Sequence, residues 1–302
     1  MELEELINGG WGRHEAETEA VARELEEHVG LVSDSGQAAA FSALASHAVG
    51  EHLRDWERAA SLIKEATKGL ADDPALTSSL ILLGIAQEFA EDAEGAAQSF
   101  ERARALARND DLVEVRTRLA RASAYMGVGT KEQLQSEHRR AMEVVDGMQD
   151  TASVDRLVAI ISNNLASHLM EQAELTREEA DGMLWIAGVA KDAWTRAGDW
   201  VNHERADYLI ALAHNRISQW SQALAAADAG LATIAANGEE EIDEAFLQLA
   251  RAQALRGSGD EEGAGEALER ADALAAPWDG GLKEWYDTVR ARVLEAPTWE
   301  PA

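Results

Sequence analysis

Apolar and polar positions follow a helical period along this chain, and small residues recur on one side of it. In six segments a small or apolar residue is followed four positions later by a larger or apolar one, and three positions after that by another small one. Offsets of four and seven lie on one stripe of an α-helix, where small side chains let neighbouring helices approach closely. The six copies are Ala59/Ile63/Ala66, Ala96/Phe100/Ala103, Leu134/His138/Ala141, Ala180/Leu184/Ala187, Ala223/Ala227/Gly230 and Ala264/Leu268/Ala271.

The spacing of these copies predicts the architecture. Their first residues are 37, 38, 46, 43 and 41 positions apart. Repetition at such a period is typical of a solenoid, in which each helical pair buries its apolar face only against its neighbours. We therefore expect an all-α fold, a right-handed superhelical solenoid of antiparallel helix pairs with about six pairs plus end caps.

Turn-forming residues divide the chain into expected helices and three regions. We expect residues 1–36 to form an N-terminal capping helical segment, 37–275 the repeat array, and 276–302 a C-terminal capping helix and tail. Residues 1–13 are weakly patterned, and the register of 153–196 stays open. The expected helices lie near 14–29, 37–53, 55–70, 75–90, 92–107, 111–126, 131–148, 153–172, 177–196, 199–217, 218–235, 239–256, 260–275 and 279–295. The stripe expected to cover the last pair is Leu282, Trp285, Tyr286, Val289 and Val293.

This arrangement resembles the tetratricopeptide repeat (TPR) family. Leu83-Gly84 in one helix, followed by Ala96, Phe100 and Ala103 in the next, matches the family pattern best. Trp56 and Trp220 stand three residues before Ala59 and Ala223, which is another habit of the family. The resemblance covers roughly 37–275 and implies a protein-binding repeat protein, although every interval here exceeds the family period of about 34 residues.

Composition narrows the class of partner. The formal net charge of −29 would repel phosphate backbones and anionic lipids, so we expect neither a nucleic-acid nor a membrane partner. The acidity fits either solubility in a salty cytoplasm or a basic partner. No Cys occurs, which excludes thiol chemistry and Cys-ligated metals. The N-terminus shows no signal peptide, so a cytoplasmic location is expected.

No motif indicates catalysis or a bound cofactor, so we expect no enzyme, no cofactor and no metal. His203, Asp207 and His214 share a helical face, but the two histidines are about 16 Å apart along the helix axis, too far for one ion. His47 and His52 are five residues apart and are expected to diverge around an α-helix.

The helix at 199–217 carries the best candidate binding stripe. If Ile210, Ala211 and His214 pack between helices, polar and aromatic side chains face the groove lined by the first helices. Arginine and tyrosine are favoured binding anchors, although the alternative is that these arginines satisfy neighbouring carboxylates. The stripe is Arg205, Tyr208, Leu212, Asn215 and Arg216.

Two further residues extend this candidate site. Asn163 interrupts an apolar helix, and an amide there could bond both N–H and C=O of an extended peptide. A polar pair with Asn164 at a bend is the alternative. Arg116 is one of three arginines around one helix of the third repeat and is a candidate for the same groove.

These observations favour a non-enzymatic helical-repeat scaffold that binds a peptide or protein segment in its concave groove. One alternative is a regulatory sensor that closes around a small peptide or metabolite. Another is an acidic assembly subunit that stacks through its ends. The sequence identifies neither the partner nor the oligomeric state.

Overall fold

The computed structural model describes residues 2–295 and 299–301, and the chain divides into two compact units, Met1–Val154 and Asp155–Ala302. The described residues form fifteen α-helices and contain no strand. The predicted all-α class of successive helix pairs is therefore confirmed. Within the same described residues, no helix combines the length and the apolar composition needed to cross a bilayer.

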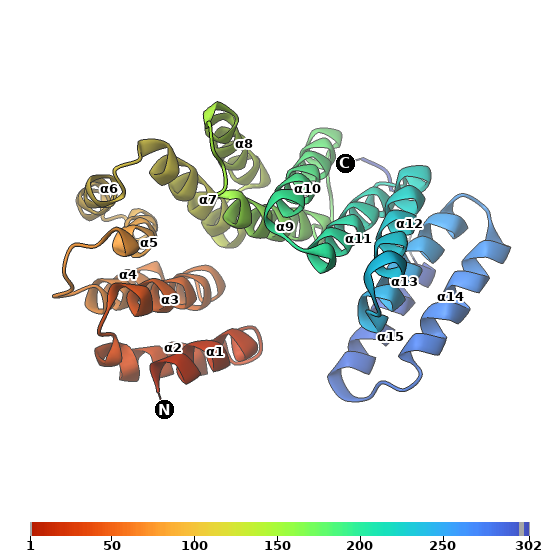
Figure 1. Cartoon of the computed structure of the whole chain (residues 1–302), viewed down its shortest axis with the longest axis horizontal. Helices are drawn as coiled ribbons and strands as arrows, with labels where there is room; N and C mark the ends of the chain where they lie inside the picture. The colour runs from red at the N-terminus through yellow and green to blue at the C-terminus, as the bar shows by residue number, and fades with distance from the viewer. Residues whose placement is uncertain (1, 296–298, 302) are drawn as a thin grey trace. The chain divides into compact units, whose positions relative to one another are not determined.

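The first unit is built from helices that lie against one another in pairs (Figure 1). The pairs are α1 with α2, α3 and its continuation with α4, α5 with α6, and α7 with α8. A π-helix, η2, continues α3 directly. The elements are α1 (Leu3–Arg13), α2 (Thr18–His28), η1 (Val29–Leu31), α3 (Ser35–Ala45), η2 (Ser46–His52), α4 (Trp56–Ala66), η3 (Pro74–Leu76), α5 (Thr77–Phe89), α6 (Ala93–Ala107), α7 (Asp110–Val128) and α8 (Lys131–Gly147).

The second unit repeats the plan and ends on an unpaired helix (Figure 1). Helix α9 pairs with α10, α11 with α12, and α13 with α14, while first helices also contact first helices, α9 with α11, α11 with α13, and α13 with α15. The elements are α9 (Asp155–Met170), α10 (Arg177–Ala197), α11 (Trp200–Arg216), α12 (Trp220–Asn237), α13 (Glu241–Gly257), α14 (Glu261–Ala275) and α15 (Gly280–Glu295).

The six copies of the small-residue signature lie on the second helix of each pair and face the core. The first and third residues of every copy are buried, including Leu134 and Gly230. The close approach that this permits is clearest between α5 and α6. A Cβ added to Gly84 would come within 2.5 Å of the Phe100 ring. The glycine thus leaves the space that the aromatic side chain of the paired helix fills.

Two expectations for the chain ends need correction. Within the weakly patterned residues 1–13, Leu3–Arg13 form a regular helix, α1, because Leu3, Leu6, Ile7 and Gly10 make a buried i, i+3, i+4, i+7 stripe that the surrounding acidic and glycine residues mask in the sequence. At the other end, α15 buries Tyr286 and Val293 as expected, but Trp285 is 53% exposed. The proposed boundaries at 36 and 276 stay a prediction, and residues 296–298 of that last region, with Ala302, lie outside the described residues.

Candidate functional site

Helices α11, α13 and α15 lie next to one another in the second unit, and each contributes one aromatic side chain to a shared face. Tyr208 comes from α11, Phe246 from α13 and Trp285 from α15, and we call these three the aromatic face. The ring centroids of Tyr208 and Phe246 are 6.4 Å apart, and those of Phe246 and Trp285 are 4.1 Å apart. Because α11 contacts α13 and α13 contacts α15, the three rings connect three successive first helices.

Burial differs sharply along the aromatic face. Phe246 is only 2% exposed, whereas Trp285 keeps 53% of its surface exposed while it packs on the Phe246 ring. Burial raises the pKa of the Tyr208 hydroxyl. Because Tyr208 is partly buried next to Phe246, it supports that ring and offers little surface to a partner. The sequence placed Trp285 in the stripe expected to cover the last pair and missed its exposure, since an i, i+3, i+4 stripe does not show which of its members reaches solvent.

Charged side chains adjoin the aromatic face at the start of α11 and α13. Arg205 donates from Nε to Asp243 Oδ2 at 2.7 Å, yet 55% of the Arg205 side chain remains exposed. Glu204 has no exposed surface, and its burial together with the neighbouring Asp243 carboxylate raises its pKa well above the usual range. The shift favours the neutral form of the Glu204 carboxyl, whose Oε1 lies 3.7 Å from Arg205 Nε.

The other stripe residues on α11 make internal contacts. Asn215 is 3% exposed and donates from Nδ2 to the carbonyl of Ala250 at 2.8 Å, so it does not face an open groove as the sequence predicted. Leu212 packs partly buried against the small residues between α11, α12 and α13. Arg216 donates to the carbonyls of Met170, Gln172 and Ala173, and thereby satisfies the end of α9.

The two outlying candidates are placed differently. Asn163 is half-buried on α9, and its Nδ2 lies 3.5 Å from Asn164 Oδ1. Arg116 belongs to the first unit, where it donates to Ser78 Oγ at 2.6 Å and to the Ser153 carbonyl at 3.5 Å. Burial lowers the pKa of the Arg116 guanidinium. Whether any residue of the predicted stripe binds a partner stays a prediction.

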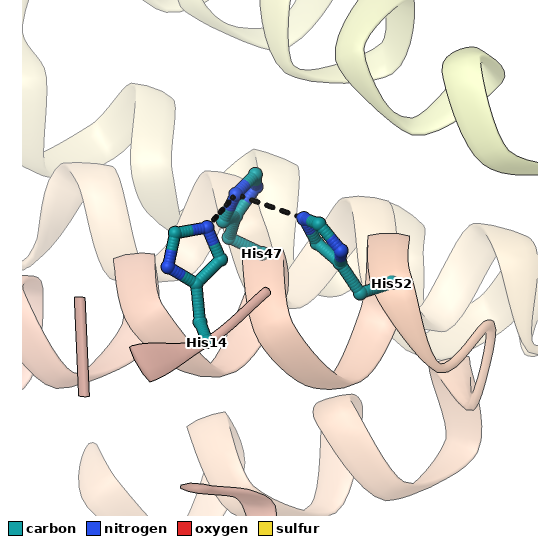
Figure 2. A group of neighbouring side chains, drawn as sticks. All are labelled: His14, His47 and His52. Atoms are coloured by element: carbon teal, nitrogen blue, oxygen red, sulfur yellow. Dashed lines mark hydrogen bonds between the residues drawn. The ribbon is translucent and has the colours of Figure 1, made fainter. Parts of the chain in front are cut away.

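In the first unit the structure brings together three histidines that the sequence analysis had kept apart. His14 lies between α1 and α2, and His47 and His52 lie on η2 (Figure 2). His47 Nε2 is 3.1 Å from His14 Nε2 and 3.2 Å from His52 Nε2. The expectation that His47 and His52 diverge is wrong. It assumed α-helical geometry, in which residues five apart point about 140° away from each other.

The π-helical geometry of η2 explains this convergence. The Leu53 N–H donates to the carbonyl of Ala48, five residues earlier, at 3.2 Å. This wider turn brings side chains five apart onto one side, and π segments of this kind occur frequently at functional sites. The Trp56 ring packs directly against the backbone of η2 at Gly50, because a Cβ added to Gly50 would lie 2.5 Å from that ring.

Neighbouring groups orient the rings of the cluster. His47 Nδ1 donates to Glu51 Oε2 at 2.6 Å, and His14 Nδ1 donates to the Trp11 carbonyl at 2.7 Å. The Trp11 ring also stacks on His47, with centroids 5.3 Å apart. Burial, and then the proximity of His47 and His14, lowers the pKa of His52 and favours its neutral form.

Comparison with known proteins supports the fold alone. No protein-family model matches the chain, and no curated protein sequence matches it. Among solved structures, the crystal structure of BtubC (BKLC) from P. vanneervenii is similar, with a TM-score of 0.51 and 13% sequence identity. That match covers 85% of this chain and 94% of BtubC. At this identity the likeness defines a helical-repeat architecture and carries no residue role.

Proposed function

We propose that the protein is a divergent member of the TPR superfamily, a non-enzymatic scaffold that binds a peptide or protein segment. The packing of Phe100 over Gly84 and the burial of Trp56 above Gly50 support the TPR assignment, because the family places small residues beneath such rings. Within each unit, first helices that contact first helices also build a face suited to an extended partner.

The exposed ring of Trp285 on the buried Phe246 carries this proposal. A tryptophan held rigid on one side and open on the other is a typical binding anchor, since little side-chain entropy remains to be lost. The half-exposed Arg205 adds a guanidinium on the same face. A segment that presents an apolar side chain to Trp285 and a carboxylate to Arg205 fits this combination.

Selection from a random peptide library on the immobilised full-length chain tests the proposal. We expect the selected peptides to lose affinity by about 10-fold or more with Trp285→Ala, and by a smaller factor with Arg205→Ala. Trp185→Ala is the matched control, because Trp185 lies on α10 and is 40% exposed. Peptides that bind all variants equally, or a library that enriches nothing, would contradict the assignment.

A small-ligand sensor is the second candidate, and an open cleft of about 730 Å³ between α4 and α6 favours it. Its lining carries charges of both signs and the apolar side chains of Leu80 and Leu83. The charged lining residues are Lys64, Lys68, Arg102, Glu65, Asp92 and Glu94. Pockets of this size accommodate small ligands. A shift of the melting midpoint with small anionic metabolites, lost in Lys64→Ala, would favour the sensor.

An assembly subunit is the remaining alternative. Light scattering measured over a range of protein concentrations would detect its association.

A further inference from the structure

Three imidazole nitrogens converge at one edge of the first unit. The Nε2 atoms of His14 and His52 lie 3.1 Å and 3.2 Å from Nε2 of His47, and the candidate ligand atoms of the three residues all lie within 4.8 Å of one another (Figure 2). In a tetrahedral site with Zn–N bonds of about 2.0–2.1 Å, neighbouring nitrogens are roughly 3.3 Å apart. The two distances from His47 Nε2 are close to that value.

Hydrogen bonds on the far sides of two rings decide where their protons sit. The Trp11 carbonyl and the Glu51 carboxylate can only accept, so Nδ1 of His14 and Nδ1 of His47 must carry the hydrogens. In the neutral rings the two Nε2 atoms then present lone pairs to each other at 3.1 Å. Two lone pairs at this distance repel, and either a proton or a metal ion between them removes the repulsion.

From this geometry we propose that His14, His47 and His52 form a binding site for a divalent first-row transition metal ion, with Zn²⁺ as the reference ion. Three neutral imidazoles suit Zn²⁺, Co²⁺, Ni²⁺ and Cu²⁺, whereas Mg²⁺ and Ca²⁺ prefer oxygen ligands. With three protein ligands, a fourth position stays open to water or to a side chain of a partner.

Glu51 is the positioning residue of this site. Its carboxylate accepts from His47 Nδ1 at 2.6 Å, which fixes the ring orientation and makes Nε2 a better donor to a metal. Glu51 lies on η2 between the two histidines, so the same π-helical turn supplies two ligands and the group that orients one of them. A net charge of −29 also raises the local concentration of cations around the chain.

Cobalt titration of the full-length chain tests the site, after chelator treatment and in buffer with excess Mg²⁺ to occupy surface carboxylates. We expect one equivalent of Co²⁺ to give the intense visible bands of a low-coordinate nitrogen site, and Zn²⁺ to displace it. His52→Ala should weaken Co²⁺ binding by at least about 10-fold, and Glu51→Gln by about 10-fold. His52 is exposed, so its removal leaves the core intact.

The matched control is His28→Ala, since His28 lies on α2 outside the cluster and should leave Co²⁺ binding unchanged. Trp11 provides a second readout, because its ring stacks on His47. Cu²⁺ should quench part of the tryptophan emission, and Trp11→Phe should remove that quenching while Co²⁺ affinity persists. A parent chain that binds Co²⁺ and Zn²⁺ no more tightly than His52→Ala would overturn the metal site and leave a proton-sharing cluster.

Discussion

The aromatic face of the second unit and the histidine cluster of the first differ in how their residues come together. On α11, α13 and α15 each side chain follows the ordinary α-helical period, so the sequence could place Arg205 and Tyr208 on one helical stripe. On η2 the period changes for seven residues, and His47 joins His52 only for that reason. Regular periodicity therefore locates candidate surfaces on regular helices and hides those that depend on a local change of helix type.

The largest expected effect is on the aromatic face. Phe246→Ala removes a ring that is 2% exposed and supports both Tyr208 and Trp285, so the free energy of unfolding should fall by about 3–5 kcal/mol. Urea denaturation measures this loss. Trp285→Ala should cost far less, because half of its ring already contacts solvent. If Phe246→Ala and Trp285→Ala lowered the free energy of unfolding equally, Phe246 would not be the buried support of an exposed Trp285.

A second test addresses the π-helix. Gly50→Ala places a Cβ 2.5 Å from the Trp56 ring and should lower the free energy of unfolding by about 1–3 kcal/mol. Gly188→Ala on α10 is the matched control, because nothing lies within 4 Å of its added Cβ. That variant should gain about 0.5–1 kcal/mol. Both values come from urea denaturation, and a stabilising Gly50→Ala would show that η2 does not need the close contact.

The contribution of Glu204 to the stability of the folded chain should depend on pH. Its pKa is raised in the folded chain, so between its usual value near 4.5 and the raised value the folded state keeps a proton that the unfolded state releases. The contribution of Glu204 to stability is full below that usual value and is lost as the pH rises. Glu204→Gln needs no proton, so it should be more stable than the parent by about 1–2 kcal/mol at pH 8.

The gain from Glu204→Gln should shrink at pH 5, where the parent carboxyl is protonated in the folded chain at little cost. Melting curves of both proteins at the two pH values measure the difference, with Glu241→Gln as an exposed control. A gain that is the same at both pH values would show that Glu204 is ionised in its buried position.

The smallest expected effect concerns His138, the middle residue of its signature copy. Burial lowers the pKa of His138 to about 4. Between pH 6.5 and 4 the unfolded chain therefore binds a proton at His138 and the folded chain does not. Other copies place Ile63, Leu184 or Leu268 there. His138→Leu should therefore reduce the loss of stability between pH 7 and pH 5 by about 1 kcal/mol, measured by urea denaturation. An unchanged slope would contradict the lowered pKa.

The sequence predicted the pairing of helices and the residues that pack between them. Ala59, Ala96 and Gly230 are buried as the signature requires, because close helix packing demands small side chains at fixed offsets. The helix expected near 131–148 is observed as α8 (Lys131–Gly147), and Thr130 Oγ1 at its start accepts from the Gln133 N–H at 3.1 Å. Such local rules need only neighbours in the sequence, so they are readable without a structure.

The tertiary structure alone decided which polar and aromatic side chains remain available. Asn215 shares a stripe with Arg205, yet one bonds a buried carbonyl and the other is 55% exposed. Likewise His14 meets His47 across 33 positions, and His52 joins them through a π-turn held by Gly50 and Trp56. Periodicity fixes the direction in which a side chain leaves its own helix. What it meets there is decided by other helices, whose approach depends on packing across the whole unit.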